Sequence, residues 1–136
     1  MDVMNKNGIA IDYSTIFIHD DTLEYAFDSV YSLLMNEGRP TAIFTGNDNL
    51  AMVAMEAIKK NGLRIPEDVS VAGFDNLNIS KYFNPSLTTV DTPKYKLGRK
   101  AMELLLKKIK GQKVENFFMK TELVIRKSTQ VVIYSK

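Results

Sequence analysis

The fold is decided by residues 41–75, which read TAIFTGNDNLAMVAMEAIKKNGLRIPEDVSVAGFD. Two short apolar runs near its ends, 41–45 and 69–74, are typical of strands buried in a parallel sheet. Between them, the residues from Leu50 to Ile58 are apolar on most sides of a helix, and Asn61-Gly62 provides a left-handed stop. A strand, a helix and a second strand in this order predict a βαβ unit, because parallel strands need such a crossover.

Strands and helices also alternate on both sides of this unit. Upstream, residues 14–18 (STIFI) predict a first strand, and the capping-box variant Asp21-Thr22-Leu23-Glu24 predicts a helix from about Thr22 to Met35. Downstream, the polar segment 76–85 predicts a loop with one helical turn. The remaining apolar runs predict a strand at 87–90 and, in the tail at 121–125 and 131–134, either two strands or one strand and a frayed end. The expected fold class is α/β, with a parallel sheet flanked by helices.

Charge is distributed unevenly along the chain, although the net charge is only +2. Residues 1–90 carry 6 Lys and Arg against 12 Asp and Glu, whereas residues 91–136 carry 12 against 4. Most of the basic residues lie in one segment, where Thr92 offers an N-cap, Pro93 a first helical position and Gly111 an end. Its apolar residues recur at helical spacing, so we interpret the lysines as the solvated face of an amphipathic helix rather than a phosphate-binding stripe.

Composition narrows the classes of function. The 136 residues include no cysteine and one histidine, which excludes disulfides and thiol catalysis and makes a metal site or a cofactor unexpected. No run of 18 apolar residues could span a membrane, and the first residues lack the basic and apolar regions of a signal peptide. We therefore expect a soluble, cytoplasmic protein that contacts no membrane.

Polar residues follow each of the first three predicted strands. They are His19-Asp20-Asp21, Gly46-Asn47-Asp48 and Gly73-Phe74-Asp75-Asn76. In open parallel sheets, ligands bind beyond the carboxyl ends of the strands, so these three places form the candidate binding site. Carboxylates and amides suit a ligand rich in hydroxyls better than a phosphate.

Each of these residues also has a purely structural interpretation. Asp21 and Asp48 stand where helix N-caps are expected, and capping alone would account for both. Asn47 and Asp75 follow a strand directly and occupy no obvious cap position. For Asp75, an Asx-turn is the alternative to a binding role.

Catalytic motifs give little support to an enzyme. His19 has no nucleophile at motif spacing, and the seven glycines form neither G-x-G-x-x-G nor a Walker loop. Asp20 and Asp21 could serve acid–base chemistry, but adjacent residues at a helix start point in different directions. We expect a binding protein and not an enzyme.

From Pro40 onward, the sequence strongly resembles the effector-binding region of LacI/GalR-type bacterial transcription regulators. The resemblance is carried by residues 40–51 (PTAIFTGNDNLA), 62–75 (GLRIPEDVSVAGFD) and 85–90 (PSLTTV), by the block from Leu97-Gly98 to Leu104-Leu105, and by the closing Arg126-Lys127-Ser128-Thr129. These blocks stand in the order and spacing of the family, whereas residues 1–39 match it more loosely. The resemblance implies a fold like type I periplasmic binding proteins, in which two α/β subdomains close around a small ligand.

The resemblance also implies roles for particular residues. Asn47 and Asp75 would contact the effector, with Asp75 accepting hydrogen bonds from ligand hydroxyls, and His19 and Asp21 would lie at the same site. Met52, Tyr82 and Phe83 would lie at a homodimer surface, although local packing of their loop explains the two aromatics equally well. The implied effector is a small sugar-like molecule.

The chain departs from the family in two respects. His19, Asp20 and Asp21 stand where family members often carry an aromatic that stacks on the effector, and most of a first subdomain and the DNA-binding domain would lie upstream of Met1. We therefore expect a truncated, partial effector-binding domain over 1–136. Residues 1–91 and about 117–136 would form the C-terminal subdomain. A helix at about 92–112 would pack on the N-terminal subdomain, and without that subdomain its apolar face must pack within the chain, swap or mediate dimerisation.

Three functions are compatible with these features of the sequence. The leading hypothesis is the ligand-sensing part of a cytoplasmic, homodimeric transcription regulator that binds operator DNA only through an N-terminal domain. The alternative is the sugar-binding component of a transporter, which shares the fold. A third possibility, an α/β enzyme using Asp20, Asp48 and Asp75, predicts turnover of its ligand.

Overall fold

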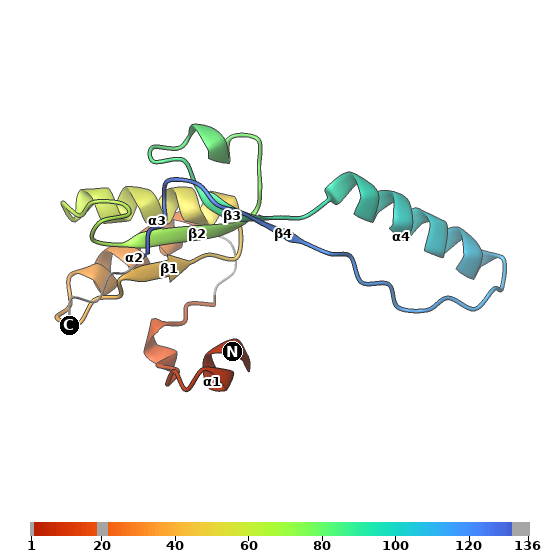
Figure 1. The fold of residues 1–136 in the computed structure, drawn as a ribbon, viewed down its shortest axis with the longest axis horizontal. Helices are drawn as coiled ribbons and strands as arrows, with labels where there is room; N and C mark the ends of the chain where they lie inside the picture. The colour runs from red at the N-terminus through yellow and green to blue at the C-terminus, as the bar shows by residue number, and fades with distance from the viewer. Residues whose placement is uncertain (1, 19–21, 132–136) are drawn as a thin grey trace.

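The computed structural model describes residues 2–18 and 22–131 (Figure 1). Its elements follow in the order α1 (Asp2–Lys6), the 3-10 turn η1 (Tyr13–Thr15), α2 (Leu23–Leu34), β1 (Ala42–Phe44), α3 (Asp48–Lys60), β2 (Ser70–Asp75), the 3-10 turn η2 (Ser80–Tyr82), β3 (Thr88–Asp91), α4 (Lys94–Ile109) and β4 (Glu122–Val124).

The strands form one mixed sheet in the order β1-β2-β3-β4. β1, β2 and β3 are parallel, with Ile43 beside Val71 and Gly73 beside Thr89, whereas β4 runs antiparallel to β3. The predicted α/β class is confirmed, with an antiparallel closing strand added to the parallel sheet. Beyond β4, the amide of Val71 donates to the carbonyl of Ser128 at 2.8 Å, so the closing segment also lies against β2.

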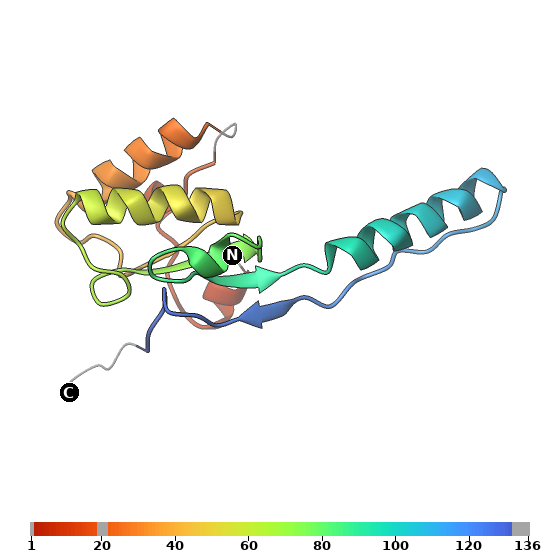
Figure 2. The ribbon, with the colours of Figure 1, turned by 90° about the horizontal axis from the view of Figure 1, so that it is seen from above.

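The core lies between the sheet and α3, and α2 packs on the other side of α3 (Figure 2). Ala51, Met55 and Ile58 of α3 meet Val71 of β2 and Leu87, and all five are at least nine-tenths buried. These α3 residues are three or four positions apart, so they share one face of the helix. Gly62 has a φ of +71°, which confirms the predicted left-handed stop.

A bidentate ion pair closes the turn between α3 and β2. Arg64 donates to both carboxylate oxygens of Asp68 at 2.9 Å, and the amide of Arg64 donates to the same carboxylate at 2.8 Å. The Arg64 guanidinium and amide hold the pKa of Asp68 well below its usual range. The turn therefore stays ordered by local contacts between residues four apart.

The predicted strand at 14–18 is wrong. Asp12 accepts hydrogen bonds from the amide of Ser14 at 2.9 Å and from its hydroxyl at 2.6 Å, which turns the chain into η1 instead of extending it. Residues 16–18 are irregular and exposed. β1 is consequently an edge strand of the described sheet, and its Phe44 is 66% exposed rather than buried as expected.

Two further boundaries differ from the predictions, and two predictions lie outside the described residues. Pro93, rather than Thr92, occupies the N-cap of α4, and no side chain caps that end. Thr22, rather than Asp21 as expected, is the N-cap of α2, and it makes no side-chain capping bond. Asp21, the first residue of the predicted capping box, and most of the run 131–134 are not described.

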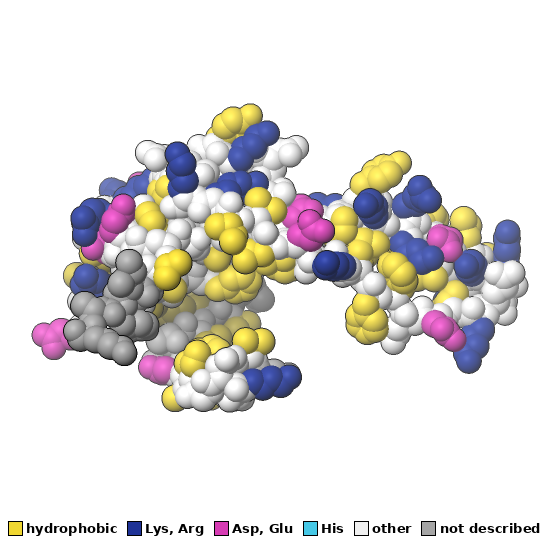
Figure 3. Space-filling view, in the orientation of Figure 1, with side chains coloured by type: hydrophobic (Ala, Val, Ile, Leu, Met, Phe, Trp, Pro, Cys, Tyr) yellow, Lys and Arg dark blue, Asp and Glu magenta, His cyan; other side chains and the backbone are white. Residues whose placement is uncertain are grey.

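α4 projects from the rest of the molecule as an arm (Figures 1 and 2). No residue of α4 is buried, and Leu97, Met102 and Leu105 are each about half exposed. Basic and hydrophobic side chains are mixed over the surface of the arm (Figure 3). Glu103 pairs with Lys100 and Lys107, each at 3.0 Å. The helix is amphipathic, as predicted, but no other helix or strand of the described chain packs closely against it, and the segment that returns to β4 runs beside it.

Within the described ranges, no helix has the length and apolar character needed to cross a bilayer.

Candidate functional site

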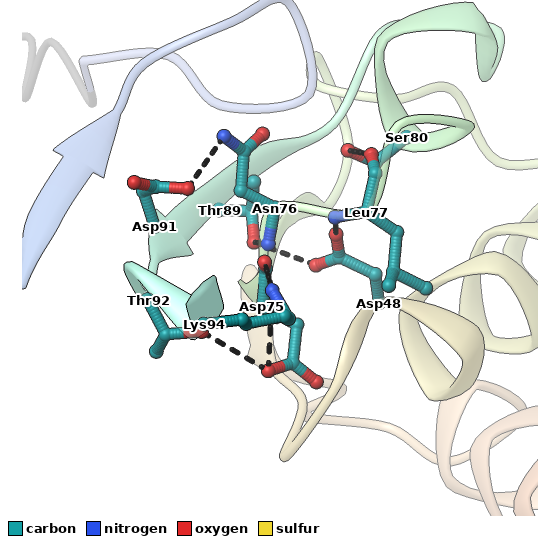
Figure 4. Close-up of polar contacts among 9 residues, drawn as sticks. All are labelled: Asp48, Asp75, Asn76, Leu77, Ser80, Thr89, Asp91, Thr92 and Lys94. Carbon is teal, nitrogen blue, oxygen red and sulfur yellow. Dashed lines mark hydrogen bonds and ion pairs between the residues drawn. The ribbon is translucent and has the colours of Figure 1, made fainter. Parts of the chain in front are cut away.

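The carboxyl ends of β1, β2 and β3 lie along one end of the sheet, because these three strands are parallel. We call this end of the sheet the strand-end edge. Thr45-Gly46-Asn47 follows β1, Asp75 ends β2 and Asp91 ends β3. Figure 4 shows Asp75, Asn76, Asp91, Thr92 and Lys94 together at this edge. Because β1 and β2 are adjacent and parallel, the polar residues that follow β1 and those at the end of β2 are neighbours in space.

Asp75 is held at this edge with part of its carboxylate uncommitted. Its Oδ1 accepts a long hydrogen bond of 3.4 Å from the Thr92 hydroxyl and lies 3.7 Å from Lys94 Nζ. Lys94 Nζ also donates to the Asp75 main-chain oxygen. Oδ2 has no partner among the residues that the structure describes, and the side chain is 34% exposed. Asp75 can therefore accept hydrogen bonds from a ligand.

The backbone around Asp75 has an unusual conformation. Asp75 has a φ of +108° and Asn76 a φ of +48°, so two successive residues other than glycine lie in the left-handed region. The Asx-turn considered as an alternative for Asp75 is absent, because the amide of Leu77 donates to Asp48 instead. Conformations of this kind persist only when the surrounding structure holds them, and they cluster at functional sites.

Asn47, and not Asp48, caps α3. Asn47 is the N-cap of α3, since its Oδ1 accepts from the amide of Leu50 at 2.9 Å, which corrects the expectation that it occupies no cap position. The side chain is half-buried at the strand-end edge, and its Nδ2 has no hydrogen-bond acceptor within 2–18 and 22–131. Asn47 can thus cap the helix with one atom and offer a donor with another.

Asp48 is fully buried and does not cap α3. Its Oδ1 accepts from the Thr89 hydroxyl at 2.6 Å, and its Oδ2 accepts from the amide of Leu77 at 2.7 Å (Figure 4). The carboxylate therefore joins α3 to β3 and to the loop after β2. Because both oxygens are occupied inside the protein, Asp48 is a bracing residue and not a ligand contact.

Gly73 makes this bracing possible. A Cβ atom at position 73 would lie 2.5 Å from Asp48 Oδ1 and 3.0 Å from Leu87 Cδ2. Such approaches are shorter than van der Waals contact, so only glycine leaves room for the buried carboxylate beside β2.

Sequence reasoning missed two polar neighbours of Asp75. The sequence pattern places Lys94, one of the lysines of the basic segment, on the solvated face of that helix, and it places Thr92 at the N-cap. The signal that could have found them is their position directly after β3, at the same sheet edge as Asp75.

His19, Asp20 and Asp21 lie outside the described residues, so their place at the site stays a prediction. Within the described ranges, no group of three or more His, Cys, Asp or Glu side chains is arranged to hold a metal ion.

Two of the three residues proposed for a dimer surface line one hollow. Met52 is 45% exposed on α3 and, with Phe83, lines a hollow of about 750 Å³ between α2 and α3. Phe83 also packs against the core, whereas Tyr82 is 73% exposed and lies 4.9 Å below Lys81 Nζ. Local packing accounts for Phe83, and a role for all three residues in a dimer stays a prediction.

The fold and the polar edge define a class of protein. Residues 4–129 match the family model of the periplasmic binding protein-like domain. Within that class, the chain belongs to the LacI family of transcriptional regulators, where it matches the effector-binding domain. The resemblance noted in the sequence is thereby confirmed.

Its relatives include regulators from several bacteria. The chain is 39% identical over 129 residues to the HTH-type transcriptional repressor PurR of Photobacterium profundum, covering 93% of this chain and 39% of the repressor. A LacI-family regulatory protein from Chloroflexus aggregans superposes with a TM-score of 0.84 at 32% identity, covering 95% of this chain and 47% of that one. The transcriptional regulator CelR in complex with cellobiose also superposes with a TM-score of 0.84, at 26% identity, covering 93% of this chain and 39% of that one. The chain thus spans less than half the length of each.

Proposed function

We propose that the strand-end edge binds a neutral, hydroxyl-rich small molecule such as a sugar, and that the chain is the ligand-sensing part of a transcription regulator. The observation that carries this proposal is the Asp75 carboxylate, which is fixed at the edge while its Oδ2 has no partner in the described structure. A carboxylate binds hydroxyl groups because each hydroxyl can donate a hydrogen bond and each carboxylate oxygen can accept more than one. The Asn47 amide adds a donor to the same edge.

The relatives support a regulator rather than a transport component or an enzyme. Those named above are transcriptional regulators, and CelR was solved with a sugar, cellobiose. In the whole protein, ligand binding here would shift subdomain arrangements and so change the affinity of an N-terminal domain for operator DNA. A cytoplasmic homodimer with Met52, Tyr82 and Phe83 at its interface belongs to the same proposal.

The arm also takes a role in this proposal. Residues 1–91 and about 117–136 would form one subdomain, and the helix at about 92–112 would pack its apolar face on a second subdomain. The exposure of Leu97, Met102 and Leu105 supports this assignment, because apolar faces of amphipathic helices are ordinarily covered.

Replacing Asp75 by alanine is expected to weaken sugar binding by about 10- to 100-fold. Hydrogen bonds to a charged group contribute roughly 1.5–3 kcal/mol, and each 1.4 kcal/mol is a factor of ten in affinity. Isothermal titration calorimetry of the chain against a panel of neutral sugars that includes cellobiose measures the change. The sugar should be recovered unaltered, as expected for a binding protein.

Asp28→Ala is the matched control, because Asp28 is another carboxylate and lines the hollow between α2 and α3. This variant should bind as tightly as the unmodified chain. Equal losses of sugar affinity in the two variants, or a loss of affinity only in Asp28→Ala, would show that the binding site does not include Asp75.

A further inference from the structure

Arg126 reaches from the closing segment into the loop that carries Asp75. Its Nη2 donates to Asn76 Oδ1 at 2.6 Å, and its Nη1 donates to the Leu87 carbonyl at 2.7 Å and to Ser80 Oγ at 3.1 Å. One guanidinium therefore joins the beginning, the middle and the end of the connection between β2 and β3. Arg126 lies two residues after β4, 50 positions from Asn76.

Asn76 transmits this contact to β3. The side-chain Nδ2 of Asn76 donates to Asp91 Oδ1 at 2.9 Å, and its main-chain amide donates to the Thr89 hydroxyl at 3.2 Å (Figure 4). The Asn76 side chain is thus held from one side by the closing segment and from the other by the strand that leads to α4. The adjacent amide of Leu77 is held in turn by the buried Asp48.

These contacts surround the two left-handed residues. Asp75 and Asn76 keep positive φ values although neither is glycine, and such backbone relaxes unless neighbouring bonds oppose it. A change of φ at Asp75 would redirect its carboxylate away from the edge of the sheet.

We propose that Arg126 is a positioning residue for the ligand site, which through Asn76 holds the Asp75-Asn76 backbone left-handed and so fixes the direction of the Asp75 carboxylate. The effect on ligand affinity rests on the proposed function, whereas the effect on the loop does not. Arg126 itself need not touch the ligand.

Amide hydrogen exchange of the chain, followed by NMR, tests the positioning directly. In Arg126→Met, the amide of Leu77 is expected to exchange at least 10-fold faster, because local opening of the loop exposes it. The amide of Val71, which donates to Ser128, should keep its protection and so report an intact sheet. Lys127→Met is the control, since Lys127 is exposed and its loss removes the same charge one position away.

A second variant covers the case in which Arg126→Met does not fold. Asn76→Ala removes the link to Arg126 while leaving the bonds from the guanidinium to Leu87 and Ser80 in place. It should accelerate exchange at Leu77 to a similar extent. Where both variants fold, adding Arg126→Met to Asn76→Ala should change the exchange rate of the Leu77 amide little further, because the two residues act as one unit.

The proposal is overturned if the amide of Leu77 in the folded variants is as well protected from exchange as it is in Lys127→Met. Equal acceleration at Leu77 and Val71 overturns it as well, because Arg126 would then stabilise the sheet as a whole. For a sugar that binds the unmodified chain, Arg126→Met should weaken affinity at least 5-fold. If no sugar in the panel binds, the proposed function fails while the exchange result still decides the role of Arg126.

Discussion

Replacing Gly73 by alanine is expected to lower the free energy of unfolding by about 3 kcal/mol, at the upper end of the usual cost of overpacking a core. The added methyl would lie 2.5 Å from Asp48 Oδ1, which cannot swing away because it accepts the Thr89 hydroxyl. Leu87 blocks another side at 3.0 Å, so β2 and α3 must move apart. Urea unfolding followed by far-ultraviolet circular dichroism measures the change.

Gly46→Ala is the control for this prediction. Gly46 has open space around its Cβ position and does not adopt a positive φ, so the same substitution should change stability little. Similar stabilities of Gly73→Ala and Gly46→Ala would show that α3 does not pack against β2 as closely as described.

Replacing Asp48 by alanine is expected to cost a comparable amount, about 3 kcal/mol. The substitution leaves the amide of Leu77 and the hydroxyl of Thr89 without their acceptor, and an unsatisfied buried donor costs roughly 1–3 kcal/mol. The same urea experiment applies, with Asn49→Ala as the control, because Asn49 is the exposed neighbour in α3. A loss of unfolding free energy no larger than that of Asn49→Ala would contradict the bracing role of Asp48.

The two substitutions should combine less than additively. Asp48→Ala removes the oxygen that a methyl at position 73 would strike, so the second substitution costs less once the first is present. Strict additivity in this double-mutant cycle would show that residues 48 and 73 do not interact.

Local sequence patterns were sufficient for most of the fold. The apolar runs that predicted strands at 41–45, 69–74 and 87–90 and the helix between the first two all correspond to described elements. In these segments, periodicity, turn residues and burial favour the same structure. At 14–18 the β-prone residues follow Asp12, whose side chain binds the backbone locally, and that contact determines the conformation.

The binding site was harder to predict from the sequence than the fold was. Asn47 and Asp48 are both residue types that cap helices, and pattern alone does not choose between them. Asp48 is turned inward because its carboxylate accepts a hydrogen bond from the hydroxyl of Thr89, which lies 41 positions later in the chain. Asp75 is predictable because it comes at the end of an apolar run, whereas its contact with Lys94 depends on where α4 begins.

The measurement that most directly tests the central claim is a two-dimensional ¹H–¹⁵N NMR titration of the chain with cellobiose and the other neutral sugars of the panel. A bound sugar is expected to shift the amide signals of Gly46, Asn47, Asp75 and Asn76, which line the edge beyond β1 and β2. It should leave those of Met52 and Phe83, in the hollow between α2 and α3, unchanged. Shifts confined to that hollow, or no shifts with any sugar, would contradict the account.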